Sequence, residues 1–156
     1  LLTGCVYLLL KHPEHLKKLT LSLRTQFLTR SDITVSSLRE HQYLNAILKE
    51  TLRLYPPFPG SLFRRSEDEG HVVMGEAIPP NTTLTANNWA ANRSALNFHV
   101  PDEMVPERWI HPRPTEYQDE DRAAMKPFSF GPSDRRNVPV EKGVYVLDKA
   151  TTGGEM

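Results

Sequence analysis

The stretch 38–60, LREHQYLNAILKETLRLYPPFPG, constrains the fold most, because it specifies both a helical periodicity and two helix ends. Its mostly apolar positions recur at i, i+3, i+4, i+7, i+8 and i+11, which at ~100° per residue form one stripe of an α-helix. The stripe consists of Leu44, Ile47, Leu48, Thr51, Leu52 and Tyr55. Ser37 and Glu40 predict a capping box at the helix start. Pro56 and Pro57 end the helix, because a residue before proline is disfavoured in the α region.

A pair of opposite charges lies on the other side of this helix. Glu50 and Arg53 are spaced i, i+3 beside Ala46, so they can form an ion pair nearly opposite the apolar stripe. The simplest interpretation is a solvated face, on which such a pair contributes only ~0.2–0.5 kcal/mol. The alternative is a buried pair, and the family resemblance given below favours it.

The size and charge of the chain exclude several classes of protein. A length of 156 residues fits one domain with one core, and the net charge of zero gives no basic surface for nucleic acid and no acidic tail. Cys5 is the only cysteine, so an intrachain disulfide or a cysteine-rich metal site is excluded. We expect Cys5 to be a small buried hydrophobic residue. The 13 prolines and 38% hydrophobic residues favour a loop-rich fragment of a larger protein.

The remaining elements are expected from periodicity and turn residues. The apolar run 1–10 stops at Lys11, about half the ~20 residues of a membrane span, and predicts the end of a buried helix; a clipped targeting segment is the alternative. Pro13 opens a second helix, and 31–36 links it to the third. Short runs at 61–65, 71–74 and 82–86, separated by turns at 67–70 and 79–81, predict a small antiparallel sheet. One helical turn is expected at 89–92 and an irregular segment at 101–126, including a solvated charged run at 116–122.

The fold class predicted from these elements is mainly α with a small antiparallel β-sheet, that is, α+β. The run KETLRLYPP at 49–57 resembles the Glu-x-x-Arg helix of the cytochrome P-450 superfamily. Four more pieces resemble the same family in the same order: 1–28, with its joint at 11–14; 59–64; 92–109, which includes Pro-Glu-Arg-Trp; and 128–132. The resemblance covers 1–134. It implies the carboxy-terminal part of a microsomal, fungal-type member of the superfamily that acts in secondary metabolism. The fold implied is a partial cytochrome P-450 fold.

The resemblance implies roles for particular residues, none of them catalytic. Arg64 stands where the family has an arginine that pairs with a heme propionate, and Phe128 and Gly131 open the heme-binding loop. A further structural set, with no contact to substrate, holds the irregular meander against the helix. It consists of Glu50, Arg53 and Arg108. Because a buried carboxylate is tolerable only when it is paired and hydrogen-bonded, two guanidinium groups suit that role.

The heme-binding loop departs from the family pattern, Phe-x-x-Gly-x-Arg-x-Cys-x-Gly. Ser133 occupies its arginine position and Arg135 its cysteine position. Arginine is a permanent cation with no lone pair for iron, so no metal ligand is predicted in the loop. We expect 1–134 to be P-450 domain and 135–156 to be a divergent, poorly ordered tail. A frameshift, a wrong splice junction and a short deletion all remain open as its origin.

Two functions follow from the resemblance. The family implies a heme-thiolate monooxygenase that uses O₂, a small apolar substrate and a cytochrome P-450 reductase, anchored to the endoplasmic reticulum membrane, with no nucleic acid and no metal other than heme iron. The alternative, favoured for the chain as written, is a non-catalytic remnant without heme. A small interaction module has no support in the residues. The histidines lack ligand spacing and are not expected to bind iron; they are His12, His15, His41, His71, His99 and His111. Trp89 and Trp109 are expected to be packing residues.

Overall fold

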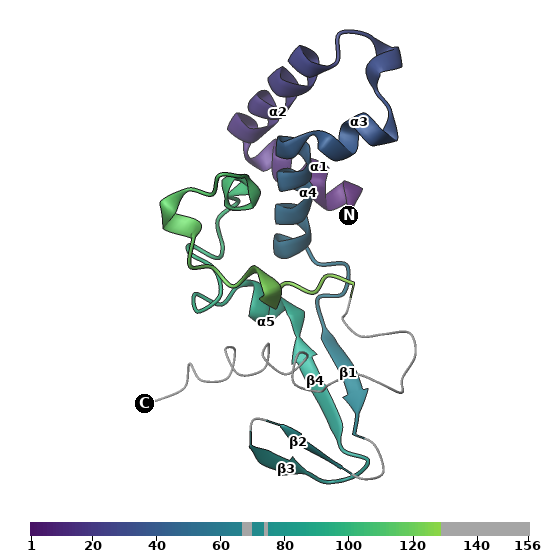
Figure 1. Cartoon of the computed structure of the whole chain (residues 1–156), viewed down its shortest axis with the longest axis vertical. Coiled ribbons are helices and arrows are strands. Elements are labelled where there is room, and N and C mark those ends of the chain that lie inside the picture. The colour runs from purple at the N-terminus through teal and green to yellow at the C-terminus, as the bar shows by residue number, and fades with distance from the viewer. Residues whose placement is uncertain (67–69, 74, 129–156) are drawn as a thin grey trace. The chain divides into compact units, whose positions relative to one another are not determined.

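The computed structural model describes residues 1–66, 70–73 and 75–128 (Figure 1). They belong to two compact units. The first contains Leu1–Tyr55 and Asp102–Asp119, and the second contains the described residues of the ranges 56–101 and 120–128. The first unit is helical and the second carries the described strands, so the class predicted from sequence, mainly α with a small antiparallel sheet, is confirmed. The predicted tail at 135–156 and most of the turn at 67–70 lie outside the described residues.

The first unit begins with two helices joined where the sequence predicts. Helix α1 spans Leu2–Lys11 and helix α2 spans Pro13–Gln26. Only His12 separates them, and Pro13 occupies the first turn of α2, where a missing N–H costs no helical hydrogen bond. Cys5 is buried in α1, as predicted. Among the described residues, no helix has both the length and the apolar character needed to cross a bilayer.

The helix expected to begin at Ser37 is two helices. Helix α3 spans Val35–Glu40 and helix α4 spans Gln42–Leu54, after the 3-10 helix η1 at Arg30–Asp32. The capping box that begins α3 pairs Thr34 with Ser37, so Ser37 is its third residue and not its cap. His41 then has non-helical dihedrals, and its Nδ1 accepts the Leu44 N–H at 3.0 Å. The start was mispredicted because histidine is not among the usual N-cap residues.

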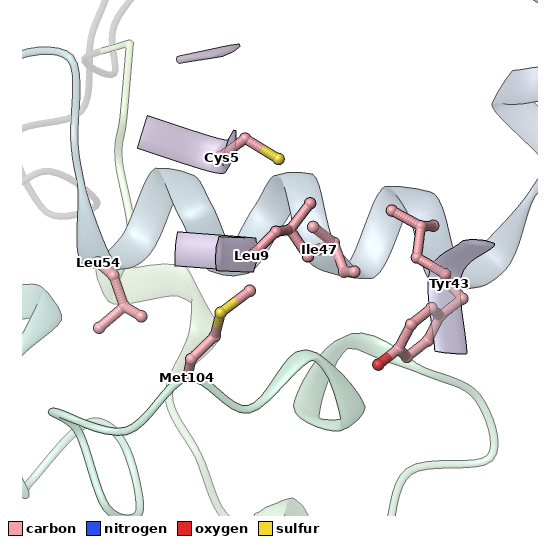
Figure 2. Packing of buried hydrophobic residues seen from close by; sticks show 7 residues of the cluster. Cys5, Leu9, Tyr43, Ile47, Leu54 and Met104 are labelled. Atoms are coloured by element: carbon pink, nitrogen blue, oxygen red, sulfur yellow. The ribbon is translucent and has the colours of Figure 1, made fainter. Parts of the chain in front are cut away.

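Helix α4 lies in the core of the first unit (Figure 2). The buried cluster combines residues of α1, α2 and α4 with one residue of the later segment: Cys5, Leu9, Leu19, Tyr43, Ile47, Leu54 and Met104. Ile47 is completely buried, as its place in the predicted stripe requires. Tyr55, expected at the end of that stripe, is 58% exposed because the helix ends at Leu54. Ala46, opposite the stripe, is buried as well as Ile47, so α4 is covered on both sides.

The second unit contains two separate two-stranded antiparallel ladders in place of one sheet. Strand β1, Ser61–Arg65, pairs with β4, Thr83–Asn87, and β2, His71–Val73, pairs with β3, Glu76–Ile78. Strand β3 was not predicted, because Glu76 and Ala77 are residue types depleted in strands, whereas the equally short β2 contains two valines. The expected helical turn at 89–92 is helix α5, Asn88–Asn92.

The region 101–126 is irregular, as expected, and contains short 3-10 turns. These are η2 at Pro106–Trp109, η3 at Thr115–Tyr117 and η4 at Arg122–Ala124. The charged run 116–122 is not uniformly solvated, because Tyr117 within it is buried. An irregular segment is tolerated when its polar groups find hydrogen-bond partners. Residues of α4 supply partners for the Glu103 carbonyl and the Val105 N–H.

Candidate functional site

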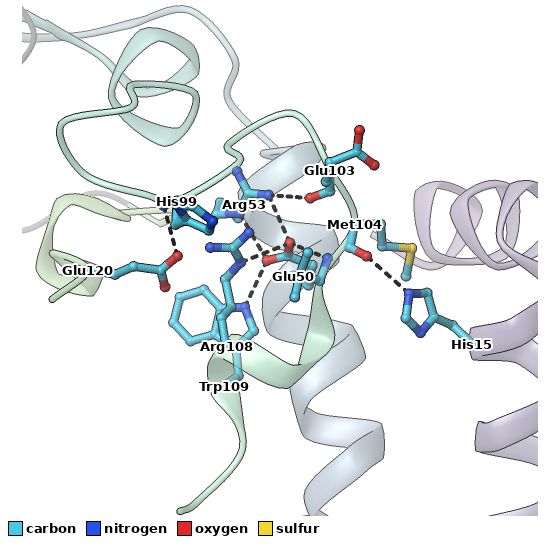
Figure 3. A network of polar contacts seen from close by, with 10 residues as sticks. His15, Glu50, Arg53, His99, Glu103, Met104, Arg108, Trp109 and Glu120 are labelled. Carbon is cyan, nitrogen blue, oxygen red and sulfur yellow. Dashed lines mark hydrogen bonds and ion pairs between the residues drawn. The ribbon is translucent and has the colours of Figure 1, made fainter. Parts of the chain in front are cut away.

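The Glu50 side chain is a buried anion on helix α4. The side chains of Glu50 and Arg53 are both 0% exposed, so the pair is buried and the solvated interpretation is wrong. Arg53 Nε donates to Glu50 Oε2 at 2.9 Å, and Arg53 Nη2 donates to Oε1 at 2.8 Å (Figure 3). Two parallel charge-assisted bonds of this kind fix the orientation of both planar groups. The i, i+3 spacing places them on one face of the helix, so the pair is intrinsic to α4.

The segment that follows Asp102 adds donors to the same carboxylate. Arg108 Nε donates to Glu50 Oε1 at 3.2 Å, and its side chain is also 0% exposed. The Val105 N–H donates to Oε1 at 2.9 Å, and the Trp109 indole N–H donates to Oε2 at 2.9 Å. In return, Arg53 Nη2 donates to the Glu103 carbonyl at 2.9 Å. We call this set the Glu50 network; it comprises Glu50, Arg53, Glu103, Val105, Arg108 and Trp109.

The network explains how a charged carboxylate is tolerated in the buried core of the unit. Burying an ionised carboxylate costs several kcal/mol after relaxation, and only charge pairing together with hydrogen bonding offsets that cost. Glu50 has both, from guanidinium, indole and backbone donors. The Arg108 guanidinium also lies over the Tyr117 ring, 5.2 Å from its centroid. The arrangement can therefore attach one element to another, because the carboxylate joins α4 to the segment 102–109.

Three members of the network, Glu103, Val105 and Trp109, were not anticipated from the sequence. Trp109 is buried, as a packing residue should be, but its indole N–H also donates to Glu50. The signal available was that a buried indole N–H usually finds an acceptor. The backbone groups of Glu103 and Val105 carry no side-chain signal at all. The structure thus brings Glu50, Arg53 and Arg108 together, while their role as a structural triad stays a prediction.

The residues expected to face heme fall largely outside what the structure describes. Arg64 lies in β1 opposite Leu84, and its side chain is outside the description. Phe128 is the last described residue and is 68% exposed. Gly131 and Arg135 lie outside the described residues. The heme-pocket assignments of Arg64, Phe128 and Gly131 therefore remain predictions.

The donor groups that the structure describes do not fit a heme-thiolate centre. Cys5, the only thiol of the chain, is 8% exposed and packs in the core cluster with Leu9 and Ile47. His15 has partners on both ring nitrogens, and the Nδ1 of the buried His41 caps α4. Within the described ranges, no group of three or more His, Cys, Asp or Glu side chains is arranged to hold a metal ion.

Comparisons with known proteins relate this chain to one family of enzymes. The family model described as Cytochrome P450 matches residues 2–134. The chain is 43% identical over 132 residues to the cytochrome P450 monooxygenase AMT3 of Alternaria alternata, and 42% identical over 132 residues to the averantin hydroxylase of Aspergillus parasiticus. These alignments cover 84% and 85% of this chain and 26% of each relative, so the chain spans about a quarter of their length. The solved structure of retinoic acid bound cyanobacterial CYP120A1 has the same fold, with a TM-score of 0.70, 21% identity, and coverage of 96% of this chain and 32% of that chain.

Proposed function

The chain belongs to the cytochrome P450 family, and we propose on that basis that it is a segment of a heme-thiolate monooxygenase that provides scaffold and not the reacting groups. The observation that carries this proposal is the complete burial of the Glu50 network. A site with no exposed atom in its charged side chains cannot meet a substrate, whereas it can hold a helix and a distant segment in one arrangement. Residues 1–134 form the P450 part in this proposal, and 135–156 form a divergent tail.

The Glu50 network acts by fixing a segment that has little regular structure of its own. The short 3-10 turn η2 presents Arg108 and Trp109, and α4 presents Glu50 and Arg53. Because the donors come from both elements, the carboxylate can be satisfied only when the segment is docked on the helix. We propose that this coupling is what the chain contributes to the whole monooxygenase.

The activity of the whole protein is part of the same proposal. By kinship, the full-length protein binds heme, takes electrons from a cytochrome P450 reductase, and oxidises a small apolar substrate with O₂ at a membrane of the endoplasmic reticulum. Arg64, Phe128 and Gly131 are the residues of this chain that would face heme. Support comes from the family match and from the monooxygenases among its relatives. Because the described donors do not fit the group, we assign no reaction step to it.

We further propose that this chain alone is not catalytic. The cysteine position of the family loop is Arg135, and the one thiol, Cys5, is in the core. A guanidinium offers no lone pair to iron. The alternative, that the chain as written is itself a working monooxygenase, draws its support from the family match alone.

Hemin titration of the purified chain tests this proposal. Absorbance in the Soret region is followed as hemin is added to the chain and, in parallel, to Glu50→Gln as a variant with a disrupted scaffold. We expect a gradual, non-saturating change that is similar for both proteins. A saturating one-to-one transition that the wild-type chain shows and the variant lacks would contradict the proposal, because it would require a formed heme pocket.

A further inference from the structure

His15, near the start of α2, connects that helix to two other parts of the first unit. Its Nε2 lies 3.0 Å from the Met104 carbonyl oxygen, and its Nδ1 lies 2.9 Å from the Tyr43 hydroxyl (Figure 3 shows the first contact). A carbonyl oxygen can only accept, so Nε2 must carry the hydrogen. In the neutral ring Nδ1 is then the acceptor, and the Tyr43 hydroxyl donates to it. The two contacts together select one tautomer.

Tyr43 is well suited to remain the donor in this arrangement. It is 7% exposed on α4, and burial raises the pKa of its hydroxyl well above the ordinary value. The ammonium of Lys18 lies 4.5 Å from the centroid of the Tyr43 ring, and the same nitrogen lies 2.6 Å from Glu107 Oε1. His15 and Lys18 are three residues apart on α2, so one face of that helix reaches both α4 and the segment 102–109.

Met104 is placed between two residues of the Glu50 network. The Glu103 carbonyl accepts from Arg53, and the Val105 N–H donates to Glu50, so both neighbours are tied to α4. The Met104 carbonyl is instead tied to α2 through His15, while its side chain is buried in the core. Three consecutive residues are thereby held by two different helices.

We propose that His15 is a positioning residue for the Glu50 network. By binding the Met104 carbonyl, it fixes the backbone at the point from which the Val105 N–H, Arg108 and Trp109 reach the carboxylate. The charge pair of the network holds the segment to α4, and the imidazole determines where along α4 the segment lies. This inference rests on the proposed scaffold role and adds to it a residue 89 positions away from the carbonyl that it holds.

Two substitutions at the same site separate the hydrogen bond from the bulk of the ring. In His15→Gln the amide nitrogen falls near the place of Nε2 and can still donate to the Met104 carbonyl. In His15→Asn the amide nitrogen falls near the place of Nδ1 and does not reach that carbonyl. Both variants are made in the full chain, and hydrogen exchange is measured at the Val105 amide and the Trp109 indole N–H, with the Trp89 indole as an internal control.

We expect His15→Asn to accelerate exchange at both positions about tenfold, as for the loss of one net hydrogen bond, and His15→Gln to stay within about twofold of wild type. In the wild-type chain, ¹⁵N spectra of neutral His15 should show a protonated Nε2 and an unprotonated Nδ1. Equal exchange in the two variants, or the averaged shifts of two tautomers, would overturn the inference. Glu50→Gln distinguishes this failure from failure of the scaffold proposal: unchanged Trp109 exchange in Glu50→Gln refutes the scaffold, whereas a response to Glu50→Gln but not to His15→Asn refutes only the role of His15.

Discussion

The indole N–H of Trp109 lies 2.9 Å from Glu50 Oε2, so two residues 59 positions apart in the chain share one hydrogen bond in a buried site. The carboxylate belongs to a regular helix and the indole to a 3-10 turn inside an irregular segment. This contact shows how the segment is held: its donors converge on a charge that α4 keeps out of water.

Removing that hydrogen bond while keeping an aromatic ring should weaken the first unit. Trp109→Phe leaves Glu50 Oε2 with one donor fewer and should lower the free energy of unfolding by about 1–3 kcal/mol. Trp89→Phe is the matched control, since Trp89 is 44% exposed. Urea unfolding of both variants provides the measurement, and equal losses would argue against a specific role of the indole.

Neutralising the carboxylate should be more damaging than removing any one donor. Glu50→Gln leaves the buried guanidinium groups of Arg53 and Arg108 without the shared anion, which costs about 3–5 kcal/mol for a broken buried pair. Glu40→Gln makes the same chemical change at an exposed position at the end of α3. Circular dichroism during urea unfolding should show a large loss for Glu50→Gln and less than about 0.5 kcal/mol for Glu40→Gln. Similar values for the two would refute the importance of the buried charge.

The geometry of the guanidinium should matter as much as its charge. Arg53→Lys keeps a cation but cannot form the two parallel bonds to Glu50 and the bond to the Glu103 carbonyl together. We expect a loss of about 1.5–3 kcal/mol. Arg39→Lys, at an exposed position of α3, should change stability little. A well-tolerated Arg53→Lys would show that charge alone suffices.

Stability should fall in alkaline solution because of Tyr43. Burial raises the pKa of its hydroxyl above the ordinary value of 10.0, with smaller contributions from the charges of Glu107 and Glu14. Above pH 10 the unfolded chain loses this proton while the folded chain keeps it. The free energy of unfolding therefore falls by up to about 1.4 kcal/mol per pH unit. Below pH 10 both states keep the proton, so the Tyr43 hydroxyl causes no loss of stability there. Unfolding measured from pH 8 to 11 should show this decline in wild type and a smaller one in Tyr43→Phe; parallel curves would exclude Tyr43 as its source.

The sequence predicted the elements of the first unit where local signals exist. The period of α4, the stop at Pro56 and the joint at Pro13 are local properties, and the structure has all three. The start of α4 was mispredicted because the imidazole of His41 takes a capping role that propensity does not assign to histidine. Strand β3 was missed because Glu76 and Ala77 give no strand signal, unlike the valines of the equally short β2.

The network itself required information that no local pattern contains. Periodicity placed Glu50 and Arg53 on one face, but left open whether that face is wet or dry. Arg108 is 58 residues from Glu50, and only the resemblance to a family connected them. The bonds from Trp109 and from the Val105 backbone depend on how an irregular segment folds, which single-residue preferences do not determine. The spacing of the histidines argues against iron binding by His15, but no sequence signal predicts its bond to Met104.

The reduced carbon monoxide difference spectrum of the chain mixed with hemin, recorded beside that of Cys5→Ala, tests the central claim most directly. The claim is that this P450 segment is scaffold without a thiolate ligand, because its one cysteine is in the core and Arg135 stands in the ligand position. We predict no band at the thiolate position for either protein. A thiolate-type band in wild type that disappears in Cys5→Ala would contradict the account, because the core cysteine would then reach the iron.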